Sequence, residues 1–114
     1  MAKTLNFNTI KREYFTVTLP DKDKTTIMIS TPTKELLGKI ISLSSSLEID
    51  YKDENAVDTL FNELYGTIAQ IMSINKGGIV ITKEKLEKCL GFEDLMIFFR
   101  EYLAFVTNIK NAKN

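Results

Sequence analysis

The spacing of apolar residues changes near Thr31, and this change limits the fold classes open to the 114-residue chain. Before Thr31, residues 14–19 alternate apolar side chains with threonines, which is the period of a half-buried β-strand. Residues 25–30 have the same character, and residues 20–24 between them supply proline and aspartate for a turn. These segments predict an antiparallel hairpin. Leu5–Asn8 also alternates and predicts a short third strand.

After Thr31 the apolar residues recur at helical spacing. We therefore predict an α+β fold, with a hairpin of two to three antiparallel strands over residues 1–31 and a compact bundle of about four helices over residues 32–110, together a single domain over residues 1–114. The expected helices run from an N-cap at Thr31 to Leu47, from an N-cap at Asp53 to the break at Asn75–Gly78, from an N-cap at Thr82 to Gly91, and from Glu93 to Ile109.

The last helix has an unusually wide apolar arc. At 100° per residue its apolar side chains span about 180°, whereas a surface helix needs roughly 100°. Either neighbouring elements wrap this helix, or part of the arc meets another chain. The second explanation predicts self-association, with candidate interface residues Met96, Phe98, Tyr102, Leu103 and Phe105.

Composition argues against most catalytic chemistry. The chain has no histidine, which removes imidazole metal ligands and histidine-activated nucleophiles, and its single cysteine, Cys89, cannot form an internal disulfide. Asp21–Asp23 resembles the opening of a calcium loop but lacks the later glycine and glutamate, and Gly77-Gly78 lacks the lysine of a phosphate loop. The acidic cluster Asp50, Asp53, Glu54 and Asp58 is better explained by helix capping and a solvated face. We expect a protein that is not an enzyme, with no catalytic residue, no cofactor and no metal.

Charge and hydropathy favour a soluble protein. Fifteen basic and fifteen acidic residues balance, so no global field attracts nucleic acid or an anionic membrane. Thirteen lysines against two arginines also disfavour readout of bases, because arginine is the residue that pairs with them best. No apolar run reaches the roughly 20 residues of a membrane span, and the first residues do not resemble a secretory leader. A cytoplasmic location is expected, with no nucleic-acid or membrane partner.

The order of these elements resembles one known family. A short start, a hairpin reading Tyr14–Asp21, a return strand that leads into Thr31–Lys34, and a compact helical region are similar to small tail assembly chaperones. These belong to long-tailed phages and prophages of low-GC Gram-positive bacteria. The resemblance implies a protein that acts in the bacterial host cytoplasm, self-associates, and binds the very long, largely helical tape-measure protein. The tail-tube protein is a second implied partner. No single residue identifies the family, so the resemblance assigns no binding positions.

Two other classes remain open. One is a small cytosolic adaptor or regulatory protein without a role in tails. The other is a structural tail completion or connector subunit.

Overall fold

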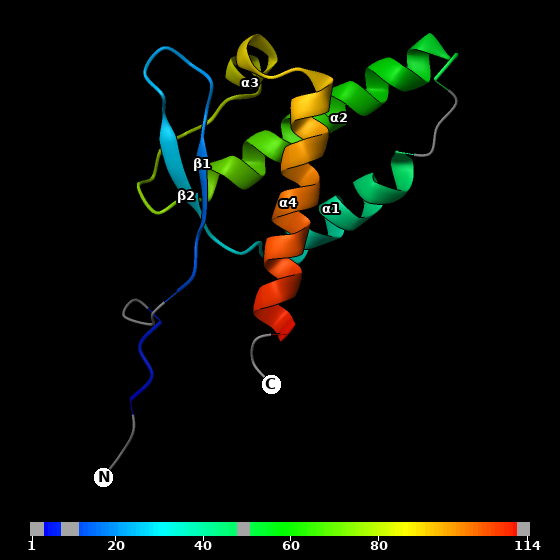
Figure 1. Cartoon of the computed structure of the whole chain (residues 1–114). Helices are drawn as coiled ribbons and strands as arrows, with labels where there is room; N and C mark the ends of the chain where they lie inside the picture. Colours follow the sequence, from blue (N-terminus) through cyan, green and yellow to red (C-terminus); the bar gives the residue numbers. More distant parts are fainter. Residues whose placement is uncertain (1–3, 8–11, 48–50, 112–114) are drawn as a thin grey trace.

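The structure is a computed structural model that describes residues 4–7, 12–47 and 51–111, with the main chain alone for residues 109–111. A two-stranded hairpin precedes four helices, and the hairpin stands beside the last helix (Figure 1). The α+β prediction is therefore confirmed. The elements are β1 (Phe15–Thr18), β2 (Thr26–Ile29), α1 (Lys34–Ser46), α2 (Glu54–Ser73), α3 (Lys83–Cys89) and α4 (Phe92–Asn111).

The hairpin forms as its alternation predicts. β1 and β2 pair antiparallel with Phe15 opposite Ile29 and Thr18 opposite Thr26. At the turn, the Asp21 carboxylate accepts hydrogen bonds from the Thr25 amide at 2.8 Å and from the Thr25 hydroxyl at 2.6 Å. A short polar side chain that binds its own turn in this way fixes the reversal of the chain.

The predicted third strand is wrong within the described residues. Residues 4–7 form no strand, and Asn8 lies outside the residues that the structure describes. Leu5 and Phe7 are 68% and 67% exposed, and the segment runs away from the body of the molecule (Figure 1). Alternation of apolar and polar residues was therefore not sufficient to make residues 4–7 a strand of the sheet.

Side-chain caps begin the first three helices. Asp53 and Thr82 cap α2 and α3 as predicted, accepting from the amides two or three residues ahead. The cap of α1 is Thr33 rather than Thr31, because the Thr33 hydroxyl accepts from the Leu36 amide at 3.2 Å. The helix therefore starts two residues later than predicted, just ahead of its first buried leucine.

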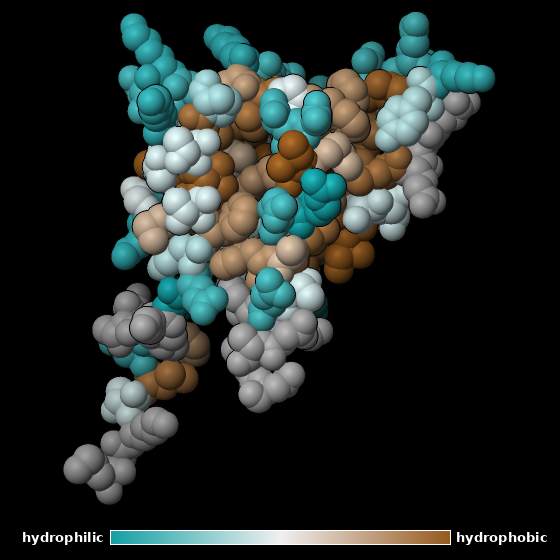
Figure 2. Space-filling view, viewed as in Figure 1, coloured by the Kyte–Doolittle hydropathy of each residue, from teal (hydrophilic) through white to brown (hydrophobic). Residues whose placement is uncertain are grey.

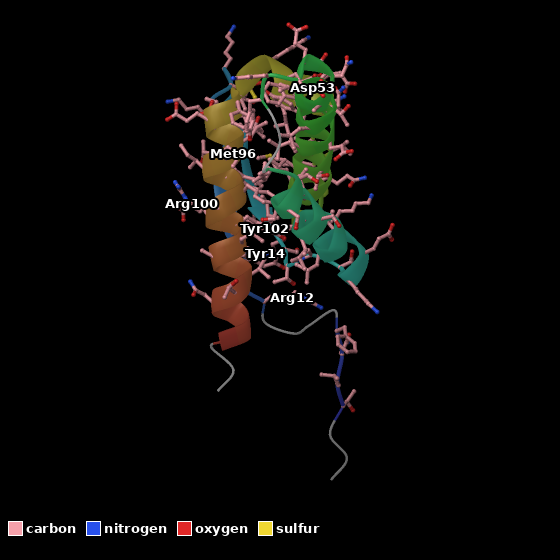
Figure 3. The ribbon with its side chains drawn as sticks, turned by 90° about the vertical axis from the view of Figure 1, so that its right-hand side faces the viewer. Arg12, Tyr14, Asp53, Met96, Arg100 and Tyr102 are labelled. Carbon is pink, nitrogen blue, oxygen red and sulfur yellow. The ribbon has the colours of Figure 1, made fainter. Side chains whose placement is uncertain are left out.

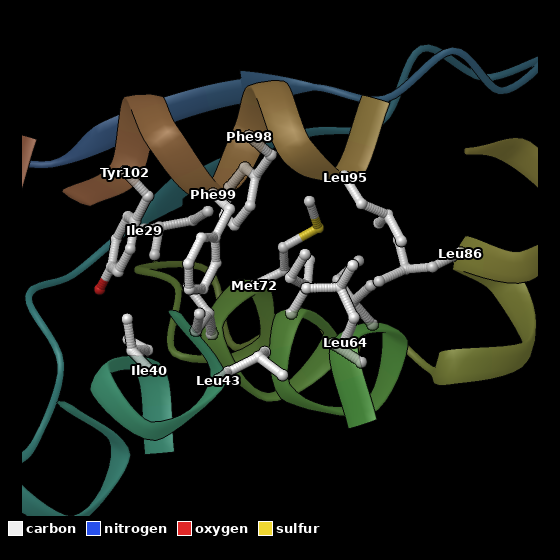
Figure 4. Packing of buried hydrophobic residues seen from close by; sticks show 14 of the residues in the cluster. Ile29, Ile40, Leu43, Leu64, Met72, Leu86, Leu95, Phe98, Phe99 and Tyr102 are labelled. Atoms are coloured by element: carbon white, nitrogen blue, oxygen red, sulfur yellow. The ribbon is translucent and has the colours of Figure 1, made fainter. Parts of the chain in front are cut away.

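One hydrophobic core joins the elements (Figure 4). α2 lies at its centre and contacts α1, α3, α4 and β2. Burial of each fully enclosed aliphatic side chain is worth about 1.5–3 kcal/mol, so this cluster holds the helices to the hairpin. The core residues of α2 are Leu60, Leu64, Ile68, Ala69, Ile71 and Met72.

Candidate protein-interaction surfaces

The wide apolar arc of α4 is largely covered from within. The Phe15 ring of β1 lies 5.9 Å from the Phe98 ring, 5.9 Å from the Tyr102 ring and 5.5 Å from the Phe105 ring, measured between centroids. Such edge-on and tilted contacts are favourable for aromatic pairs. The hairpin thus covers one flank of α4, which agrees with a central helix wrapped by its neighbours.

Two of the five candidate interface residues are consequently in the core. Phe98 is 7% exposed and Tyr102 is 0% exposed, so in this conformation neither offers surface to another chain. Sequence gives the width of an apolar arc and not what covers it, and the role of these two residues at an interface stays a prediction. Met96, Leu103 and Phe105 are partly buried against the same core. Self-association itself stays a prediction.

The Tyr102 side chain links α4 to the segment between β2 and α1. Its side chain lies between α4 and the rest of the protein, whereas Arg100 projects away from α4 (Figure 3). The Tyr102 hydroxyl donates to the Ser30 carbonyl at 2.8 Å, at the junction between β2 and α1. Burial raises the pKa of the Tyr102 phenol well above its ordinary value of 10.0. The neutral phenol is therefore held as a hydrogen-bond donor.

A groove of about 240 Å³ runs between β1 and α4, and we call it the β1–α4 groove. Residues 15–20 form one wall, and one face of the first half of α4 forms the other. Ile97 on that face is 44% exposed. Lining residues beyond residues 15–20 are Met72, Leu90, Asp94, Ile97, Phe98 and Glu101.

The two edges of the hairpin differ. On β2, the Ser30 amide donates to the Ile74 carbonyl at 2.9 Å, and the Lys76 amide donates to the Met28 carbonyl at 2.9 Å. The segment after α2 therefore covers the β2 edge. Within the described residues the sheet has two strands only, so no strand pairs with the outer edge of β1. An unpaired strand edge is a template for pairing with another chain.

Two further hollows, of about 700 Å³ and about 380 Å³, share Ser46 and Glu63 in their linings, and we call the two together the α1–α2 cleft. Small residues line it on the α1 side, with Gly38, Ser42 and Ser46 spaced four residues apart. Gly66 lies on the facing side, on α2. Lys39 crosses between the helices and donates to the Gln70 side chain at 3.4 Å. The residues that line the cleft are therefore mostly small or polar, whereas the surface that they expose to it is more apolar than polar.

Another hollow of about 290 Å³ is lined by residues of α1 and by Leu103 of α4. Ile41 on its α1 wall is 59% exposed. Hydrophobic colour gathers in the middle of the face shown in Figure 2, and hydrophilic residues gather at its upper corners. The exposed apolar surface is therefore not spread evenly.

Among the titratable residues singled out in the sequence, Asp21 has defined structural partners. Asp21 binds Thr25 at the hairpin turn and pairs with Lys85 of α3 at 3.0 Å, and the Thr25 donors hold the pKa of the Asp21 carboxyl far below its ordinary value of 3.8. Asp50 lies outside the described residues. Burial raises the pKa of the Cys89 thiol above 9.0, which makes the thiolate scarcer. In the parts of the chain that the structure describes, no group of three aspartate, glutamate or cysteine side chains is placed to hold a metal ion.

Comparison with protein-family models, curated proteins and solved structures gave no match. None of the helices among the described residues is both long and apolar enough to span a membrane.

Sequence reasoning missed both main hollows. The four-residue spacing of Gly38, Ser42 and Ser46 was a signal for the α1–α2 cleft, because such residues share one helix face. The β1–α4 groove had no comparable local signal, since its walls are far apart in the sequence.

Proposed function

We propose that this protein is a non-catalytic tail assembly chaperone that binds a helical segment of the tape-measure protein and self-associates during tail assembly. The observation that carries the proposal is the α1–α2 cleft. The α2 residues along its two hollows run from Asn55 to Gln70, which at 1.5 Å per residue is roughly 22 Å. A partner helix of about four turns matches that length.

The glycines of the cleft support a close approach by another backbone. Gly38 and Gly66 lie inside α1 and α2, where each costs the free protein about 0.5–1 kcal/mol relative to alanine. A Cβ at either position would meet no atom within 4 Å, so internal packing does not require glycine at these positions. A helix seated in the cleft would give these two positions a reason to lack side chains.

The chemistry of the cleft matches a partner of mixed polarity. Glu35, Lys39 and Glu63 line it with both signs of charge, and hydroxyl groups lie between them. A helix that presents small and polar residues can form hydrogen bonds there without burying an unpaired charge. The very long, largely helical tape-measure protein is the partner that the family resemblance implies.

The test is binding of the tape-measure protein that we expect a neighbouring gene to encode, before and after one side chain is added to the cleft. Gly66→Gln should fill the cleft and weaken binding at least about tenfold, while raising helix propensity so that the fold is not lost. Asp58→Gln adds the same side chain to an exposed position of α2 that lines neither hollow, and should bind like the wild type. Isothermal titration with purified proteins measures both affinities.

Two results would overturn the proposal in different ways. Equal affinity of the Gly66→Gln variant and the wild type would exclude the cleft as the site. No binding of the wild type to the tape-measure protein would exclude the chaperone function. The gene order gives an independent check, since a tube gene upstream and a very long coiled-coil gene downstream are expected.

A further inference from the structure

The main-chain direction of β1 leaves two donors at its open edge. The Leu19 amide donates to the Thr25 carbonyl at 2.8 Å, so Leu19 points its N–H toward the return strand. Main-chain groups of successive residues in a strand point to alternate sides. The N–H groups of Thr16 and Thr18 therefore point away from β2, and both residues line the β1–α4 groove.

The groove beside this edge is built for apolar side chains. Ile97 and Phe98 lie on its α4 wall, and Ile97 is 44% exposed. A strand added to β1 would place every second side chain against this wall.

A segment near the start of the same chain has apolar side chains at the spacing that this wall would accept. Leu5 and Phe7 are two residues apart, so in an extended strand both point to one side. They are 68% and 67% exposed, and Figure 1 shows their segment directed away from the body rather than toward β1. The Arg12 guanidinium donates to the Phe7 carbonyl at 2.9 Å on this outlying segment.

The β1–α4 groove and the first twelve residues carry opposite charges. The groove is lined by two acidic residues, Asp94 and Glu101, and by no basic residue. Residues 1–12 of the sequence contain Lys3, Lys11 and Arg12 and no acidic residue. Opposite charges on the two surfaces steer their encounter and fix its orientation.

We infer that copies of this chain associate by strand addition, in which the segment around Leu5–Phe7 of one copy pairs with the open edge of β1 in another copy and lays its two apolar side chains in the β1–α4 groove. The inference rests on the self-association that the proposed function includes, and it names the contact. It does not need the tape-measure protein.

Two full-length variants separate the donor segment from the acceptor groove. The donor variant Leu5→Asp with Phe7→Asp changes two exposed residues outside the core, and the acceptor variant Ile97→Glu changes the exposed residue of the groove wall. Sedimentation velocity should show association of the wild type weakened at least about tenfold in each variant. Val80→Asp is the matched control, since Val80 is 76% exposed and lines no part of the groove, and it should associate like the wild type.

Mixing the two variants gives the decisive measurement. The donor variant keeps a working groove and the acceptor variant keeps a working segment, so together they should form a dimer that neither forms alone. Thr16→Pro, which removes an outward N–H, is a second acceptor variant whose fold is checked by circular dichroism. Association of the donor variant as strong as the wild type, or failure of the mixed variants to combine, overturns strand addition while leaving tape-measure binding untouched. A wild type that stays monomeric at the highest concentration overturns self-association as a whole, and tape-measure binding by that monomer is then measured separately.

Discussion

Three tyrosines allow the value of a hydrogen bond to be measured as a function of burial alone. Each hydroxyl donates to a main-chain carbonyl at nearly the same distance, and each can be replaced by phenylalanine without opening a cavity. Tyr102 is 0% exposed, Tyr65 is half-buried and Tyr51 is 54% exposed. The pairs are Tyr102 with Ser30 at 2.8 Å, Tyr65 with Leu90 at 2.7 Å, and Tyr51 with Leu47 at 2.7 Å.

The expected costs follow from what replaces the lost donor. After Tyr102→Phe, the part-buried Ser30 carbonyl loses its donor next to a fully buried ring, and we expect the free energy of unfolding to fall by about 1.5 kcal/mol. That loss corresponds to a decrease in Tm of roughly 5–10 °C for a domain of this size. After Tyr51→Phe, solvent replaces the hydroxyl, and we expect a loss below about 0.5 kcal/mol. Tyr65→Phe should lie between the two.

Urea unfolding followed by circular dichroism measures the three free energies under the same conditions. An unchanged slope with urea shows that only the native state was altered. If Tyr102→Phe is as stable as the wild type, or if Tyr51→Phe costs more than Tyr102→Phe, then burial does not set the cost and the reasoning is refuted.

Three other predictions concern pH and backbone conformation. Burial raises the pKa of Tyr102 above its value in the unfolded chain, so the unfolded state loses this proton first as pH rises. The free energy of unfolding should therefore fall above about pH 10, and it should fall less steeply in Tyr102→Phe. Urea midpoints measured at alkaline pH test this. Hydrogen bonds from Thr25 hold the Asp21 pKa low, so the contribution of Asp21 to the free energy of unfolding is complete above about pH 4 and is lost as pH falls. In Asp21→Asn, the free energy of unfolding, measured in the same way, should therefore depend less on pH in the acid range. Gly78 has φ 68°, so Gly78→Ala should cost about 1 kcal/mol, whereas Gly38→Ala should gain about 0.5–1 kcal/mol in thermal melts.

The features predicted correctly from sequence are those that depend on near neighbours in the chain. Asp53 and Thr82 were identified as caps because a cap binds amides two or three residues ahead. The hairpin was found because its alternation and its turn lie within a short stretch of residues. Thr31 was predicted as the cap of α1 because the proline that follows it suits the first position of a helix, whereas α1 is capped by Thr33, three positions before Leu36.

The features that sequence did not give depend on contacts between distant segments. The apolar arc of α4 is a local pattern, but its covering by Phe15 is a contact between distant parts of the chain. Leu5–Asn8 has the alternation of a strand, yet a strand also requires an edge to join. The structure leaves one such edge on β1, and residues 4–7 do not occupy it within their own chain.

The two proposed contacts have a joint consequence for assembly. The α1–α2 cleft and the β1–α4 groove share no lining residue, so one copy can hold a helix and pair with another copy at the same time. Strand addition from one copy to the next uses different surfaces on the two partners, and such a contact either closes into a ring or continues as a chain. Copies joined in this way would present a row of clefts to one long helix. Each cleft could then bind weakly, because the attachment of neighbouring copies raises the effective concentration of the next cleft along the helix. Tape-measure binding should therefore weaken more in the donor variant than the loss of any direct contact explains, although its cleft is unchanged.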